Sequence, residues 1–172
     1  MTIWVKGYNV APMEPTLYSS RSSFDSLVVR WMAIEKECRL VHRVVETFEV
    51  TMTPLPCLQD RDLNLVSHEP MIQYLQERYP GDPLLPADPK VRAQIRQICW
   101  LIRENQEDFI GDLSLILGPR RGYLAGTEFT LADVYAGTRL HLLPYGQKGV
   151  PHNVQDYYIR LAGREAFKEA IR

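Results

Sequence analysis

The stretch from Thr51 to Pro80, TMTPLPCLQDRDLNLVSHEPMIQYLQERYP, constrains the fold of this chain more than any other. A short apolar run at Cys57-Leu58 follows a proline, and polar residues follow at Gln59 to Asp62. Apolar and polar residues then alternate from Leu63 to Val66. Alternation around a polar turn predicts two strands joined by a hairpin.

A helix is predicted directly after this hairpin. Ser67 can accept a hydrogen bond from a free amide of the first helical turn, which makes it a candidate N-cap. Pro70 is tolerated there because the first turn needs no intrahelical donors. Met71 and Leu75 then lie on one apolar face, and Tyr79-Pro80 ends the helix.

Three elements are expected upstream of this stretch. Pro15–Ser19 is predicted as a first strand, and Leu40–Val45 alternates as a second strand. Between them a helix is predicted from about Phe24 to Glu37, because apolar residues recur at helical spacing. These residues are Leu27, Trp31 and Ile34. Ile3-Trp4-Val5 is either an added strand or part of an extension that lies over the surface.

The second half of the chain reads as a series of helices. Pro80 to Pro89 is rich in proline, which stiffens a linker and breaks any helix, so a domain boundary is expected there. Apolar residues then recur at helical spacing. The predicted helices cover Pro89 to about Asp108, Phe109–Leu117, Thr130 to Pro144, Gln155–Leu161 and Arg164–Arg172.

The segment around Thr130 carries a recognisable helix start. Thr130 is followed three positions later by Asp133, so each side chain can bond an amide of the other residue's turn. This arrangement is a capping box in which Asp replaces the usual Glu. Asp133 is therefore interpreted as a folding device and not as an acid–base residue.

Composition narrows the classes of function. The formal charge of −1 gives no net field for binding nucleic acid, and no apolar run reaches the ~20 residues that span a bilayer. Cys38, Cys57 and Cys99 are widely spaced, which favours free thiols in a reducing cytoplasm. The N-terminal sequence lacks the apolar centre of a signal peptide. The four histidines are too dispersed to predict a metal site.

The order strand, hairpin, strand, helix, YLQERYP and PLLPADP resembles the second half of the thioredoxin-like domain of glutathione transferases. More narrowly, it is similar to the stringent starvation protein A branch of that superfamily. The resemblance extends to Leu17–Ser19 upstream and Phe129–Asp133 downstream. It implies an α/β plus all-α fold. A thioredoxin-like domain with an N-terminal extension is expected over residues 1–83, and a shortened helical domain over residues 84–172.

The resemblance also places a glutathione-type pocket on this sequence. The position of the family's reactive group falls on Ser23–Ser26, which holds no cysteine, so disulfide exchange there is excluded. Ser23 either bonds a glutathione sulfur or caps the following helix. Leu55-Pro56 matches the family's cis-proline, where the backbone of the preceding residue pairs with the cysteinyl part of glutathione. Thr53-Pro54 is a competing candidate.

Two parts of that pocket are altered. The family's Glu-Ser pair, which binds the γ-glutamyl end of glutathione, falls on Ser67-His68, so the carboxylate is missing. His68 either binds an anion at the helix N-terminus or is an exposed helix-start residue. Glu46 to Thr53 is too short for the helix that relatives place there, with its two connections.

The linker suggests a protein partner. In stringent starvation protein A relatives, a Pro-His-Pro patch at this position meets the sigma factor on RNA polymerase. The corresponding residues here are Pro80-Gly81-Asp82, so the histidine is replaced. The candidate partner surface consists of Tyr79, Pro80, Gly81, Asp82 and Pro83.

The leading hypothesis is a non-enzymatic, cytoplasmic binding protein that contacts RNA polymerase or its sigma factor and needs no cofactor. The resemblance implies a homodimer, with Trp100 and Leu101 at its interface. The alternative is a glutathione-dependent transferase, in which Ser23 steadies the thiolate, Leu55 pairs with the peptide, and Ser67 or His68 takes the carboxylate. A dimerising structural module of a larger complex is a third reading.

Overall fold

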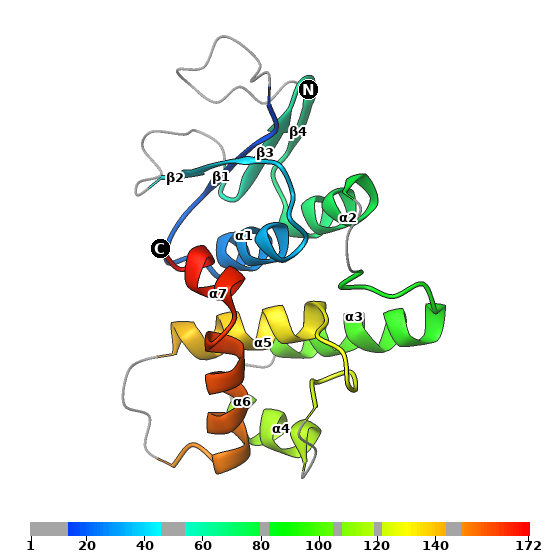
Figure 1. The fold of residues 1–172 in the computed structure, drawn as a ribbon, viewed down its shortest axis with the longest axis vertical. Coiled ribbons are helices and arrows are strands. Elements are labelled where there is room, and N and C mark those ends of the chain that lie inside the picture. Colours follow the sequence, from blue (N-terminus) through cyan, green and yellow to red (C-terminus); the bar gives the residue numbers. More distant parts are fainter. Residues whose placement is uncertain (1–13, 46–53, 80–82, 105–107, 119–121, 144–148) are drawn as a thin grey trace. The chain divides into compact units, whose positions relative to one another are not determined.

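The computed structural model describes residues 14–45, 54–79, 83–104, 108–118, 122–143 and 149–172 (Figure 1). The chain divides into two compact units, of which the first combines Met1–Asp82 with Glu169–Arg172 and the second is Pro83–Lys168. The sequence did not indicate that Glu169–Arg172 joins the first unit. Three sequence interpretations, at Ile3–Val5, Glu46–Thr53 and Pro80–Asp82, lie outside the described residues.

The first unit contains a mixed sheet of four strands in the order β2-β1-β3-β4. The strands are β1 (Thr16–Ser19), β2 (Val41–Val44), β3 (Cys57–Asp60) and β4 (Leu63–Leu65). β1 pairs in parallel with β2 and antiparallel with β3, which pairs antiparallel with β4. A parallel pair needs a crossover connection, and a helix supplies it here.

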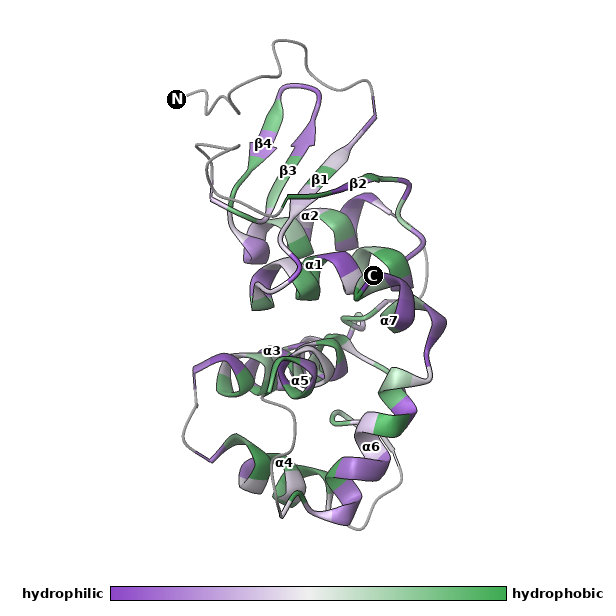
Figure 2. Cartoon of the chain, turned by 90° about the vertical axis from the view of Figure 1, so that its left-hand side faces the viewer, coloured by the Kyte–Doolittle hydropathy of each residue, from purple (hydrophilic) through white to green (hydrophobic). Residues whose placement is uncertain are grey.

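That helix is α1 (Phe24–Glu35), and α2 (His68–Arg78) follows β4. Figures 1 and 2 show α1 and α2 next to each other on one side of the sheet. The apolar faces of both helices are buried with the central strands. The core residues of this unit that are almost fully buried include Leu17, Leu58, Val28, Trp31, Met71 and Leu75.

The hairpin between β3 and β4 is tighter than the polar run suggested. Asp60 pairs with Leu63, so the turn is Arg61-Asp62 and not Gln59 to Asp62. Arg61 adopts a left-handed backbone conformation with φ 55°. Asp60 remains in the strand although it is buried, because its carboxylate accepts a hydrogen bond of 2.5 Å from the Tyr74 hydroxyl.

The second unit is built from helices in its described part. They are α3 (Pro89–Glu104), α4 (Phe109–Leu117), α5 (Leu131–Leu142), α6 (His152–Ala162) and the start of α7 (Glu165–Ala170). α3 packs on α5, and α6 packs on both α4 and α5. The buried face of α3 carries Ile95, Cys99 and Ile102, which follow one another at helical spacing. The described part of α3 reaches Glu104, and Asp108 caps α4.

The carboxylate of Asp133 connects several elements at the centre of this unit. It accepts hydrogen bonds from the Thr130 N–H at 2.8 Å, the Leu124 N–H at 2.9 Å and the Tyr157 hydroxyl at 2.7 Å. The predicted capping box is present. The side chain is fully buried. Asp133 therefore joins the start of α5 to the preceding loop and to α6, which is the folding role that the sequence indicated.

No helix in the described segments has both the length and the apolar character that a membrane span requires. Within the same segments, no group of His, Cys, Asp or Glu side chains lies close enough together to bind a metal ion.

Candidate functional site

The peptide bond between Leu55 and Pro56 is cis, as the sequence predicted. Pro56 is buried directly before β3, and Leu55 packs against a small cluster formed by Tyr18 and Cys57. Burial raises the pKa of the Cys57 thiol to about 11, so this thiol is protonated and weakly nucleophilic at neutral pH. Leu55-Pro56 thus has the cis geometry that the resemblance implied, and the thiol beside it is not reactive at neutral pH.

Ser23 is the N-cap of α1. Its hydroxyl accepts a hydrogen bond of 3.4 Å from the Ser26 N–H, so the helix-cap reading is confirmed. The buried Ser26 hydroxyl in turn accepts a bond of 3.0 Å from the Ser20 N–H. Hydrogen bonds to serine hydroxyls thus link the loop before α1 to the first turn of that helix. The Ser23 hydroxyl already has a partner within the protein.

His68, the first residue of α2, is only 3% exposed. Its Nδ1 atom lies 3.6 Å from the Oδ1 atom of Asp25, which stands in the first turn of α1. The prediction of an exposed helix-start residue is wrong, because α1 and α2 pack together and enclose the imidazole. The available sequence signal was Asp25, an acidic residue in the first turn of α1, where a helix favours negative charge.

Ser67 occupies the predicted N-cap position of α2 with an extended backbone. The predicted hydrogen bond is absent, because the exposed side chain makes no capping contact. The hydroxyl of Ser67 therefore faces solvent at the start of α2, while the neighbouring imidazole of His68 is turned into the unit.

These residues fit glutathione only in part. The cis Leu55-Pro56 bond suits the cysteinyl backbone of the peptide. At the start of α2, where the resemblance places the γ-glutamyl carboxylate, the imidazole of His68 is buried and already paired with Asp25. Asp25 also adds a negative charge near that position, which disfavours a second carboxylate. The described residues at the start of α2 therefore differ from the carboxylate-binding end that the resemblance implies.

Sequence reasoning missed a second buried polar cluster in the first unit. Arg30 on α1 is 3% exposed, and it donates from Nε to the Ala170 carbonyl at 2.5 Å and from a terminal nitrogen to the Ser19 hydroxyl at 3.1 Å. Burial, together with the charge of Arg21, lowers the pKa of Arg30. An arginine next to the apolar stripe of Leu27, Trp31 and Ile34 was the available signal.

The candidate partner surface is described only at its two ends. The ring of Tyr79 is half-buried, its hydroxyl donates to the Arg39 carbonyl at 3.2 Å, and the Arg78 guanidinium lies 5.6 Å from its centroid. Pro83 is exposed. Pro80, Gly81 and Asp82, which complete this surface, lie outside the described residues.

No protein-family model matches the sequence. Among curated proteins, the sequence is 28% identical to a stringent starvation protein A homolog from Coxiella burnetii, over 91% of this chain and 90% of the relative. It is 32% identical to a protein of the same name from Pasteurella multocida, over 52% of this chain and 46% of the relative.

The fold is that of glutathione transferases. A glutathione S-transferase from the Antarctic clam Laternula elliptica superposes with a TM-score of 0.80 at 19% identity, covering 92% of each chain. A glutathione transferase homolog from Burkholderia GL BGR1, solved with bound glutathione, gives a TM-score of 0.75 at 22% identity, covering 91% of this chain and 95% of that one. The protein is thus glutathione-transferase-like in fold, and its sequence resembles the stringent starvation protein A branch of that superfamily.

Proposed function

We propose that this protein is a non-enzymatic binding protein of the stringent starvation protein A kind, which contacts RNA polymerase or its sigma factor in the cytoplasm. One observation carries the proposal: the imidazole of His68 is buried against Asp25, at the position where the family receives the carboxylate of glutathione. Because Asp25 already occupies the position beside this imidazole, we infer that the protein acts through its surface.

Two further observations on the structure support the proposal. The Ser23 hydroxyl caps α1, where a catalytic serine would steady a thiolate. Cys38, Cys57 and Cys99 are all buried free thiols, so none is presented as a nucleophile. The curated relatives carry the name stringent starvation protein A homolog, which agrees with a binding role of that kind.

We place the partner contact around Tyr79 to Pro83. The Tyr79 ring is half-buried, its hydroxyl donates to the Arg39 carbonyl, and the Arg78 guanidinium lies over it. Aromatic side chains held in this way are typical of the centres of protein interfaces. We also propose a homodimer in which Leu101 of α3, 39% exposed, contributes to the interface.

A binding assay with purified RNA polymerase tests this function. The immobilised protein should retain the holoenzyme, and retention should fall for a Tyr79→Ala, Pro83→Ala double variant. Lys90→Gln, an exposed change on α3, is the matched control and should bind like the original protein. Failure of the original protein to retain core enzyme or holoenzyme at any salt concentration would reject this partner.

The alternative, a glutathione-dependent transferase, is favoured by one observation: the chain shares its fold with a glutathione transferase homolog solved with bound glutathione. In that reading Ser23 steadies the thiolate of a bound glutathione, and the exposed hydroxyl of Ser67 helps to hold its carboxylate. Turnover of glutathione with an electrophilic substrate, lost in Ser23→Ala, would establish this activity in place of the binding role.

A further inference from the structure

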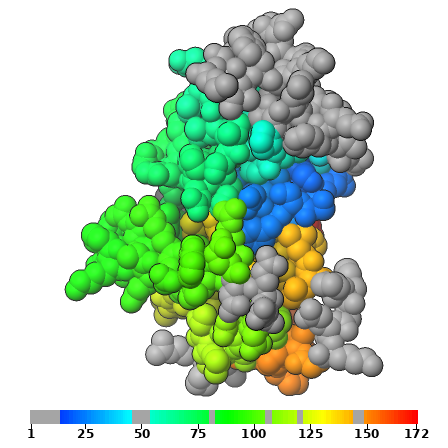
Figure 3. Space-filling view, turned by 180° about the vertical axis from the view of Figure 1, so that it is seen from behind, coloured from blue at the N-terminus to red at the C-terminus, as the bar shows by residue number. Residues whose placement is uncertain are grey.

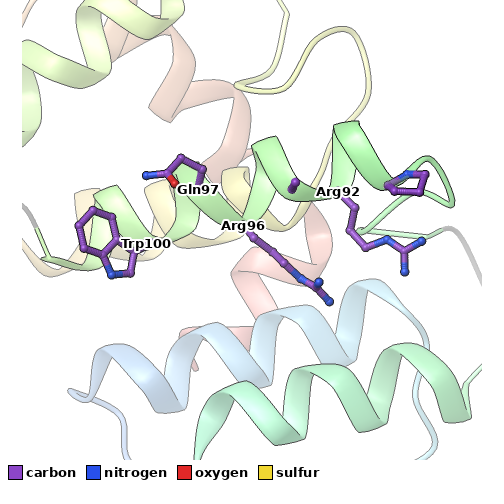
Figure 4. A pocket seen from close by; sticks show the side chains of 6 residues that line it. Arg92, Arg96, Gln97 and Trp100 are labelled. Carbon is purple, nitrogen blue, oxygen red and sulfur yellow. The ribbon is translucent and has the colours of Figure 1, made fainter.

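An open hollow of about 580 Å³ lies along α3 in the second unit (Figure 4). In the space-filling view of Figure 3, α3 is part of the green surface of the molecule. The lining residues are Pro89, Arg92, Ala93, Arg96, Gln97 and Trp100. The lining contains two cationic side chains, one large aromatic side chain and no acid.

The spacing of these residues places the charges in a row. Arg92, Arg96 and Trp100 follow one another at four-residue intervals, so they project from one face, about 6 Å apart along the axis. Ile95 and Cys99 lie on another face of α3 and are buried. Figure 4 shows the side chains of Arg92 and Arg96 extending to the same side of the helix.

The donors of this row are incompletely used. A terminal nitrogen of Arg92 donates to the Ala87 carbonyl at 2.7 Å, while its buried Nε atom has no partner among the described residues. Arg96 is exposed and forms no ion pair within the described part of the chain. Guanidinium groups with free donors bind carboxylates through paired hydrogen bonds.

Trp100 gives the row an apolar end. Its side chain is 56% exposed, although a large indole gains free energy from burial. Tryptophan and arginine are the residues that contribute most binding energy at protein interfaces. Two guanidinium groups that form no ion pair within the described residues, followed by an exposed indole, therefore match a partner that presents carboxylates next to an apolar side chain.

We propose that the row Arg92–Arg96–Trp100 binds an acidic helical segment of a partner protein. The 6 Å interval of the arginines matches one helical turn, so two carboxylates in an i, i+4 relationship meet both guanidiniums, and an apolar side chain one turn further meets Trp100. This inference goes beyond the contact proposed at Tyr79 to Pro83 and does not depend on it.

A second copy of this chain fits the row less well. A two-fold contact centred on Arg96 brings guanidinium groups against guanidinium groups, which is unfavourable. This assignment takes Trp100 out of the expected dimer interface and leaves Leu101 available for it. A nucleic acid strand would also bind arginine and tryptophan, but a single row on a chain of net charge −1 gives it little else to follow.

Fluorescence anisotropy with a labelled synthetic peptide tests the proposal on the whole chain. The peptide is a stabilised helix with Glu at i and i+4 and Leu at i+8, and its control carries Gln at both Glu positions. We expect the Glu peptide to bind in the micromolar range, and the Gln peptide to bind at least about tenfold more weakly. Added salt should weaken the binding.

Variants of the protein locate the site. Arg92→Gln with Arg96→Gln, and separately Trp100→Ala, should each weaken binding about tenfold or more. Lys90→Gln removes one exposed charge from another face of the same helix and should change little. Circular dichroism confirms that each variant is folded, and Tyr79→Ala with Pro83→Ala should leave this peptide binding unchanged.

Four results would overturn the proposal. They are no binding of the Glu peptide at millimolar concentration, equal loss in Lys90→Gln and in the double variant Arg92→Gln, Arg96→Gln, tighter binding of an oligothymidylate with the same arginine dependence, and conversion of a dimer to a monomer by Trp100→Ala. The third result would assign the row to nucleic acid, and the fourth to a second copy. Loss of RNA polymerase binding with retained peptide binding would reject only the function proposed above.

Discussion

The imidazole of His68 and the carboxylate of Asp25, 3.6 Å apart, connect the first turns of α2 and α1 in the first unit. The imidazole is buried, whereas 32% of the Asp25 side chain is exposed. This pair lies at the start of α2, where the resemblance to glutathione transferases implies a site for the γ-glutamyl carboxylate of glutathione. We therefore expect the contact to contribute both to the stability of this unit and to the loss of that site.

Replacing His68 tests how much this contact contributes to the free energy of unfolding. His68→Ala removes a buried ring and leaves Asp25 without this partner, so we expect a loss of about 2 to 3 kcal/mol in the free energy of unfolding. Asp25→Asn keeps a polar neighbour for the ring and should cost about 1 kcal/mol. Urea denaturation measures both, and a loss below about 0.5 kcal/mol for His68→Ala would show that the imidazole is not held as described.

Arg30 provides a sharper test, because two variants should differ. Arg30→Lys retains the charge but loses the fork that reaches the Ala170 carbonyl and the Ser19 hydroxyl, and we expect a cost of about 2 to 4 kcal/mol. Arg30→Met removes the buried charge and should cost less. Denaturation of both variants is the measurement, and equal stability of Arg30→Lys and the original protein would contradict this role.

His42 should make stability depend on pH. Burial, with the nearby charge of Arg30, lowers the pKa of His42, and Glu169 opposes this only in part. The unfolded chain therefore binds more protons than the folded one as the pH falls below about 6.5, so the stability contributed at neutral pH is lost in that direction. His42→Asn should show a smaller loss between pH 7.5 and 5.5, and a loss equal to that of the original protein would exclude His42 as its source.

The cysteines should be unreactive while the protein is folded. Burial raises the pKa of Cys38 and of Cys57 to about 11 and raises that of Cys99 further, so few thiolates exist at neutral pH. A disulfide reagent should label none of the three quickly at pH 7.5 and all of them in urea. Rapid labelling of Cys57 in the folded protein would reopen the question of thiol chemistry beside Pro56.

Local signals predicted most of the fold. Some features depend on residues close together in the sequence, namely the capping box of Thr130 and Asp133 and the helix at Phe109–Leu117. The cis bond at Leu55-Pro56 follows from a motif that the family shares. The predicted turn, Gln59 to Asp62, is longer than the observed one. Asp60 stays in its strand because it accepts a hydrogen bond from Tyr74, which lies on the following helix.

The candidate site was harder to predict because its deciding contacts are distant in the sequence. The sequence left two roles open for Ser23, a helix cap and a catalytic group. The hydrogen bond from the Ser26 amide shows that it caps α1. His68 required knowledge that Asp25 lies beside it, and Arg30 required the carbonyl of Ala170. The type of a residue alone does not determine whether it is buried, because burial depends on which other elements pack against it.

Calorimetric titration with glutathione tests the central claim most directly. If the imidazole of His68 and the carboxylate of Asp25 have replaced the carboxylate-binding end of the cradle, no saturable heat should appear at millimolar glutathione, and Ser23→Ala should behave identically. Saturable binding at millimolar concentration or tighter, abolished by Ser23→Ala, would contradict the account and establish a glutathione site in this protein.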